Sequence, residues 1–193
     1  MMNNRSKQRS SAEHQRRGFL KLAGATGISL TFLSLRSAHA KTYLNLEQAQ
    51  KLLLPNKSLT PSNVTLTDVQ KKSIQAASKV RVRSNNVVAW KSGEGDWLLL
   101  EQIIGKHENI DMAFALDSQG RVLGMEVLTY RESYGHEIRH PKWRAQFHGK
   151  DSSERLKLDK QIKNISGATL SCRHVTDGVN RITQTWNLVL RHL

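Results

Sequence analysis

Two β-rich runs joined by a tight turn constrain the fold of this 193-residue chain more than any other feature. Ile110 to Leu116 and Val122 to Tyr130 are apolar, and the turn between them, Asp117 to Gly120, ends in glycine. Such a pattern predicts a β-hairpin. Further strand signals extend it into a twisted, largely antiparallel sheet from about Val80 to Tyr130, with expected strands at Val80–Arg83, Val87–Trp90 and Trp97–Ile104.

Helical patterns flank the predicted sheet. Near the carboxyl end, apolar residues at spacings of three and four form one stripe: Val175, Val179, Ile182, Trp186, Leu190 and Leu193. The stripe predicts a long C-terminal helix packed on the sheet. Shorter helices are expected over Leu46–Leu53, stopped by Pro55, over Thr67–Ala77 after a linker through Pro61, and over Pro141–Phe147. The fold class is therefore α+β.

The amino end has the features of an export signal. Arg16 and Arg17 precede an apolar stretch, Leu22 to Leu35, and the sequence Ala38-His39-Ala40 suits a signal peptidase. Paired arginines indicate the twin-arginine route and a periplasmic location, with cleavage after Ala40. A membrane anchor is the alternative, but the stretch is short for a bilayer. We expect a signal peptide over 1–40, a helical segment over 41–79, a domain over 80–193, and no integral membrane segment after cleavage.

Charge and cysteine content narrow the possible functions. The chain carries a net charge of +14; the leader holds seven of the 30 Lys and Arg residues and one of the 16 acids, which leaves +8 after cleavage. No basic stretch is interleaved with aromatic residues, so an anionic cofactor, an acidic redox partner or the membrane surface is favoured over nucleic acid.

Cys172 is the sole cysteine, which excludes an internal disulfide and haem attachment, and we expect it to pack in the core. The histidine spacings match no strong metal motif.

The run Ile165 to Ser171 places three hydroxyl side chains and Gly167 immediately before the C-terminal helix. The first amides of a helix lack backbone partners and carry partial positive charge, so this run suits a phosphate. The alternative is that Ser166 or Ser171 simply caps the helix.

Four pieces of sequence in order resemble the FMN-binding domain family of periplasmic flavin subunits of sodium-pumping NADH:quinone reductase, related ferredoxin-linked pumps and small exported flavoproteins. The resemblance covers roughly residues 80 to 185. Its pieces are Phe114–Gly124, Glu132–Ile138, Trp143 with Phe147, and Ser166–Thr169.

The resemblance implies that FMN is attached through its phosphate to Thr169 by a periplasmic flavin transferase, which uses FAD and a divalent metal. Gly167 and Ala168 leave room for that approach. The implied phosphate-end residues are Ser166, Gly167, Ala168, Thr169, Leu170 and Ser171. The stretch implied to lie against the flavin ring is Glu132, Ser133, Tyr134, Gly135 and His136, with Ile138 supporting its apolar face.

One departure from the family pattern concerns attachment. The family has an aspartate six residues before the acceptor threonine, whereas this chain has Lys163. Lys163 could slow attachment or indicate a transferase of different tolerance, and FMN could then be held without a covalent bond.

The expected function is electron transfer between a membrane donor and a periplasmic acceptor, without a dedicated catalytic constellation. Glu132 with His136 is a candidate proton relay to the flavin. Two alternatives stay open: a flavin-dependent oxidoreductase acting on its own small substrate, and a noncovalent flavin-binding or assembly protein. The chain shows no nicotinamide-binding glycine fingerprint, which weakens the first alternative.

Overall fold

The computed structural model describes residues 40–193, so the predicted twin-arginine signal lies outside the described residues except for Ala40. The elements are β1 (Lys41–Thr42), α1 (Leu46–Leu53), β2 (Leu59–Pro61), β3 (Val64–Thr65), α2 (Asp68–Ser78), β4 (Asn86–Ser92), β5 (Trp97–Ile104), β6 (Asn109–Leu116), β7 (Val122–Tyr130), η1 (His136–Arg139), α3 (Pro141–Arg144), η2 (Ala145–Phe147), α4 (Thr169–Leu188) and η3 (Leu190–His192). None of these helices is long and apolar enough to cross a membrane.

The strands form an antiparallel sheet in the order β1-β7-β6-β5-β4-β2, and β3 also pairs with β4. The predicted hairpin is confirmed as β6 and β7, in which Ile110 lies opposite Tyr130 and Leu116 lies opposite Val122. The α+β class is confirmed, and so are the helices α1, α2 and α3, with Pro141 at the first position of α3.

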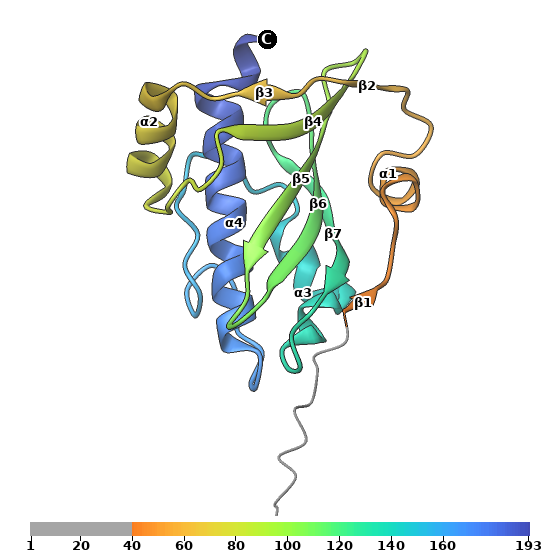
Figure 1. Cartoon of the computed structure of the whole chain (residues 1–193), viewed down its shortest axis with the longest axis vertical. Helices are drawn as coiled ribbons and strands as arrows, with labels where there is room; N and C mark the ends of the chain where they lie inside the picture. The colour runs from red at the N-terminus through yellow and green to blue at the C-terminus, as the bar shows by residue number, and fades with distance from the viewer. Residues whose placement is uncertain (1–39) are drawn as a thin grey trace, which may run out of the picture. The chain divides into compact units, whose positions relative to one another are not determined.

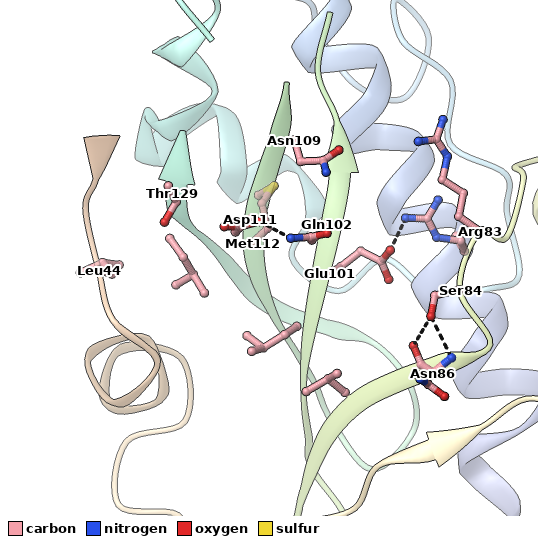
Figure 2. A pocket seen from close by; sticks show the side chains of 14 residues that line it. Leu44, Arg83, Ser84, Asn86, Glu101, Gln102, Asn109, Asp111, Met112 and Thr129 are labelled. Atoms are coloured by element: carbon pink, nitrogen blue, oxygen red, sulfur yellow. Dashed lines mark hydrogen bonds and ion pairs between the residues drawn. The ribbon is translucent and has the colours of Figure 1, made fainter. Parts of the chain in front are cut away.

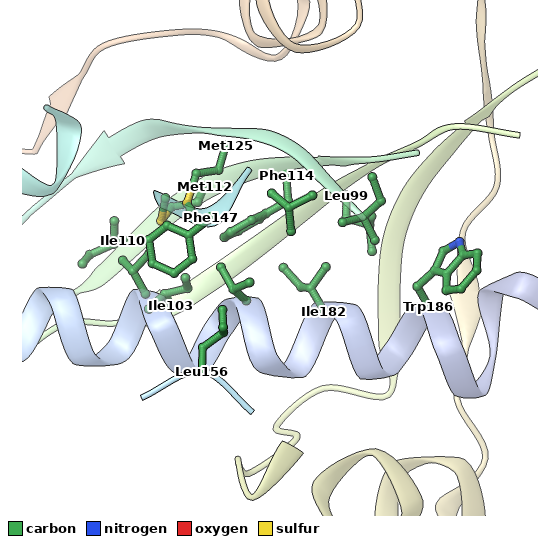
Figure 3. Packing of buried hydrophobic residues seen from close by; sticks show 14 of the residues in the cluster. Leu99, Ile103, Ile110, Met112, Phe114, Met125, Phe147, Leu156, Ile182 and Trp186 are labelled. Atoms are coloured by element: carbon green, nitrogen blue, oxygen red, sulfur yellow. The ribbon is translucent and has the colours of Figure 1, made fainter. Parts of the chain in front are cut away.

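Helices lie on both faces of this sheet, with α4 along one face and α1 against the other (Figure 1). Side chains alternate between the faces along β6. Ile110, Met112, Phe114 and Leu116 join the larger core cluster with α4, whereas Ala113 and Ala115 join the smaller cluster with α1. In Figure 3, Ile182 of α4 points toward the sheet residues Phe114 and Leu99. The larger side chains thus fill the α4 face, and alanines let α1 approach the other.

The stripe that predicted α4 is confirmed for five of its six residues. Val175, Val179, Ile182, Trp186 and Leu190 are all buried. Leu193 was predicted wrongly and is 65 % exposed. The reason is that α4 ends at Leu188 and the chain continues as the 3₁₀ turn η3, which breaks the helical spacing before Leu193 is reached.

Two glycines let bulky side chains interlock between α4 and the sheet. A Cβ on Gly178 of α4 would lie 2.5 Å from Cδ1 of Ile103 in β5. A Cβ on Gly120, in the β6–β7 turn, would come within 2.1 Å of the ring of Trp186. The two contacts are eight residues apart along α4, which is about 12 Å of helix.

The segment before β4 differs from its prediction. The predicted linker through Pro61 contains β2, which pairs with the edge of β4, and Pro61 is tolerated there because it lies at the sheet edge. Val80–Arg83 was predicted as a strand but belongs to none. The N–H of Val82 instead donates to a side chain of α2, Oε1 of Gln75, at 3.3 Å. The division at residue 80 stays a prediction, and β2 and β3 pair with β4 across it.

The connection that leads into α4 is held at two points. The side chain of Asn180 in α4 accepts from the N–H of Leu156 at 2.8 Å and donates to its carbonyl at 2.9 Å. Further along, Trp143 Nε1 donates to the carbonyl of Lys163 at 2.7 Å, and the N–H of Lys163 donates to Gln146 Oε1 at 2.8 Å. The chain therefore enters α4 from a fixed position.

Candidate functional site

Helix α4 begins without a side-chain cap. Ala168 is its N-cap residue, which contradicts the alternative that Ser166 or Ser171 caps the helix. Gly167 precedes it with φ of +86°, a conformation that glycine adopts without strain. Within residues 40–193, the N–H groups of Thr169, Leu170 and Ser171 have no hydrogen-bond acceptor. These three donors and the helix dipole favour an anion at this position.

The hydroxyl of Thr169 is positioned by a neighbour in the preceding loop. Thr169 is half-buried, and its Oγ1 accepts a hydrogen bond from Nδ2 of Asn164 at 3.0 Å. The other amide atom, Oδ1 of Asn164, is buried without a partner among the described residues.

A buried network joins the start of α4 to the end of β7. The Tyr130 hydroxyl hydrogen-bonds with Ser171 Oγ at 3.0 Å and donates to the carbonyl of Tyr134 at 2.5 Å. Burial raises the pKa of Tyr130 to about 12, so the phenol stays protonated at neutral pH. Gly135 lies against this network, because a Cβ there would be 2.4 Å from Ser171 Oγ and 2.7 Å from the Tyr130 hydroxyl.

Glu132 ties a second loop to the same end of the sheet. Its Oε1 accepts hydrogen bonds from the N–H groups of His107 and Glu108, at 2.5 and 3.0 Å, in the β5–β6 loop. Burial opposes ionisation of Glu132, but the backbone amides outweigh it and hold the pKa of this carboxyl below its usual range. Glu132 is therefore an anionic loop clamp at neutral pH, which leaves the predicted proton relay with His136 without support.

These loops and the start of α4 enclose a cavity of about 340 Å³. Most of the predicted site residues line it: Glu132, Tyr134, Gly135, Gly167, Ala168, Thr169, Leu170 and Ser171. Four predicted residues do not line it: Ser133, Ser166 and His136 are exposed elsewhere, and Ile138 is fully buried in the core. Ile138 therefore supports the loop by packing.

Sequence reasoning missed two residues at this cavity. Lys106 lines it from the β5–β6 loop, and Asn164 contacts the Thr169 hydroxyl from the loop before α4. The short spacing between Asn164 and Thr169 was a usable signal. No local signal existed for Lys106, because only the sheet topology brings its loop to the start of α4. Its side chain adds a positive charge to the lining of the cavity.

The side chain of Lys163 does not line the Thr169 cavity. It is exposed and lines a neighbouring cavity of about 550 Å³ with Glu137, His140, Lys142, Trp143, Gln146 and Ile165. Over residues 40–193, no group of three or more His, Cys, Asp and Glu side chains is placed to hold a metal ion. Cys172 is buried as predicted, and burial raises the pKa of its thiol.

A larger cavity of about 570 Å³ is lined by residues of β4, β5, β6, β7 and α4 (Figure 2). None of the described residues that line it belongs to the predicted site. Glu101 of β5 and Arg181 of α4 both line it, and their side chains pair at 2.5 Å. Burial raises the pKa of Glu101 even with this guanidinium beside it. This ion pair links the sheet to α4 away from the start of the helix.

Comparison with known proteins points to the part of the chain that lines the 340 Å³ cavity at the start of α4. The FMN-binding domain family matches residues 105–184, a range that contains the whole lining. The chain is also similar to a protein of Shewanella piezotolerans (strain WP3 / JCM 13877) that is one of the subunits of an ion-translocating oxidoreductase complex, with 29 % identity over 113 residues. That alignment covers 52 % of this chain and 53 % of the relative, so the chain spans about half the length of this curated relative.

The cavity fits the phosphate end of FMN on three grounds. Three helix-initiating amides lack acceptors, small residues at Gly167 and Ala168 leave room for close approach, and Lys106 supplies a positive charge. Its volume lies in the range of about 300–1,000 Å³ that small-molecule sites occupy. Residues 105–184 of this chain, which include every residue lining the cavity, match the FMN-binding domain family.

Proposed function

We propose that this chain is an exported electron carrier whose FMN is joined by a phosphoester bond to Thr169. The observation that carries the proposal is that Thr169 lines a cavity at the start of α4, where the first three N–H groups of the helix lack acceptors. The threonine and the phosphate-binding amides thus belong to the same turn of α4.

Attachment is a phosphoryl transfer in which Thr169 is a substrate of a periplasmic flavin transferase. The Thr169 oxygen forms a bond to the FMN-side phosphorus of FAD, and the bond from that phosphorus to the bridging oxygen breaks. AMP leaves with the bridging oxygen, and the hydroxyl proton passes to a base. The unpartnered amides of α4 and Lys106 stabilise the negative charge of the attached phosphate.

Bound FMN supplies one- or two-electron transfer. Tyr134 is 81 % exposed and Leu170 is 41 % exposed, and both border the cavity. Their apolar surfaces are available to cover part of a planar ring, which would explain why two large side chains remain exposed at this position.

Redox partners and location follow from two separate features. The similar protein belongs to an ion-translocating oxidoreductase complex, which supports electron exchange with a membrane donor. The pattern in residues 1–40 supports a periplasmic location and a periplasmic acceptor. Fractionation of cells expressing the full chain, with an Arg16→Lys/Arg17→Lys variant as control, tests the route. The variant should remain in the cytoplasm.

The decisive experiment is the intact mass of the full chain after coexpression with a flavin transferase. The parent and a Thr60→Ala control, which removes an exposed hydroxyl in β2, should gain the mass of FMN less one water. Thr169→Ala should gain nothing. A yellow parent without added mass indicates noncovalent binding, and a colourless parent overturns the proposal. Turnover of a small substrate by the purified protein alone would favour the oxidoreductase alternative.

A further inference from the structure

We propose that Asn164 is a positioning residue for flavin attachment, and that its side-chain amide holds the Thr169 hydroxyl in the orientation that reacts. The proposal rests on the proposed attachment at Thr169. It assigns a role to a residue that is neither the acceptor nor the residue six positions before it.

The backbone around Asn164 is held in place on both sides. On one side, Gln146 and Trp143 bind the N–H and the carbonyl of Lys163. On the other side, the N–H of Ala168 donates to the carbonyl of Ile165 at 3.0 Å and closes the turn that begins α4. The side chain of Asn164 therefore projects from a fixed point toward the first residue of the helix.

The hydrogen bond between Asn164 and Thr169 has a direction that suits the reaction. Nδ2 of Asn164 donates to Oγ1, so the bond uses one lone pair of the oxygen. The hydroxyl proton then points elsewhere and can leave, while the second lone pair remains for attack on phosphorus. After attachment, Oγ1 is an ester oxygen with no proton, and an amide N–H can still donate to it.

The second amide atom indicates that this arrangement is not explained by packing alone. Oδ1 of Asn164 is buried and has no partner among the described residues, and a buried acceptor without a donor costs free energy. Rotating the amide would place Oδ1 at the hydroxyl and leave Nδ2 unpartnered instead. Either way one amide atom is unsatisfied, so the hydrogen bond to Thr169 comes with a free-energy cost that a small apolar residue would avoid.

An aspartate at this position would have the opposite effect. Its carboxylate can only accept, so it would bind the Thr169 proton and hold it, and its negative charge would repel the incoming phosphate. Asn164→Asp is nearly identical in shape to the parent, which makes it the sharpest test. Asn85→Asp is the matched control, because Asn85 is exposed, lies before β4, and its side chain accepts one hydrogen bond, from Lys71.

The experiment measures the initial rate of FMN attachment to purified, unmodified full chain with FAD and a flavin transferase, by intact mass. We expect Asn164→Ala to lower kcat about tenfold and Asn164→Asp to lower it further, with the KM for the protein substrate unchanged, because orientation of the nucleophile is lost. Asn85→Asp should match the parent. Thermal unfolding of each unmodified variant is measured in parallel.

The outcomes separate the two proposals. If the parent gains no mass, the proposed function fails. If the parent is modified and both Asn164 variants are modified at the parental rate, only the role of Asn164 is overturned. A slower rate accompanied by a matching fall in thermal stability and a raised KM would show a purely structural role and would also overturn it.

Discussion

Substituting Gly135 by alanine should disturb the start of α4. The effect has a steric part and a part from backbone strain, and a control variant distinguishes the two. Gly135 has φ of +92°, and the added Cβ would lie 2.4 Å from Ser171 Oγ and 2.7 Å from the Tyr130 hydroxyl. The side chains that bridge β7 and α4 must therefore move apart.

The expected cost has two parts. A left-handed backbone conformation costs a non-glycine residue about 1–2 kcal/mol. Separating Tyr130 from Ser171 removes a buried hydrogen bond and leaves polar atoms unpaired, which costs about 1–3 kcal/mol more. Gly135→Ala should therefore lose about 2–5 kcal/mol of unfolding free energy.

Gly149→Ala supplies the matched control. Gly149 also has a positive φ, +73°, but a Cβ there meets nothing within 4 Å. It should cost only the backbone term of about 1–2 kcal/mol. Urea denaturation followed by circular dichroism measures both variants. If Gly135→Ala is no more destabilising than Gly149→Ala, the reasoning from steric contact is wrong.

Three further predictions concern buried ionisable groups. Because the pKa of Tyr130 is raised to about 12, its contribution to stability is complete below its unfolded pKa near 10 and is lost above it. Urea titrations above pH 10 should therefore show the unfolding free energy of the parent falling more steeply than that of Tyr130→Phe. Arg181→Met strands the Glu101 carboxylate, which is 29 % exposed, and should cost about 2 kcal/mol at pH 7. Denaturation repeated at pH 4 should show a smaller cost, since the raised pKa of Glu101 lets it become neutral; an equal cost would contradict this. Cys172 should resist iodoacetamide in the native protein and react fully in denaturant, as counted by mass.

Features set by local pattern could be predicted from the sequence. The hairpin of β6 and β7 follows from strand-forming runs and a glycine turn, and α4 follows from its apolar spacing. Val80–Arg83 shows the limit of pattern, because alternation of apolar and basic residues does not provide a strand partner. The edge strand β2 was not predicted, because it is short and only its pairing with β4 defines it as a strand.

The residues of the candidate site also fall into those that the sequence predicts and those that it cannot predict. Residues of one continuous run, such as Thr169 and its neighbours, were predicted because their chemistry depends on the helix start that they themselves form. Lys106 could not be predicted, since it reaches the cavity through the β5–β6 loop. The role of Glu132 was also out of reach, because its hydrogen-bond partners lie 24 and 25 residues away in the chain.

The two glycine interlocks between α4 and the sheet fix where the helix can begin. With Ile103 seated at Gly178 and Trp186 seated at Gly120, α4 cannot slide along its own axis without expelling one of these side chains. The position of Thr169 relative to the end of β7 therefore depends on side-chain packing in the core, away from the cavity. Substitutions far from the cofactor pocket can thus alter its width while every residue lining it stays the same.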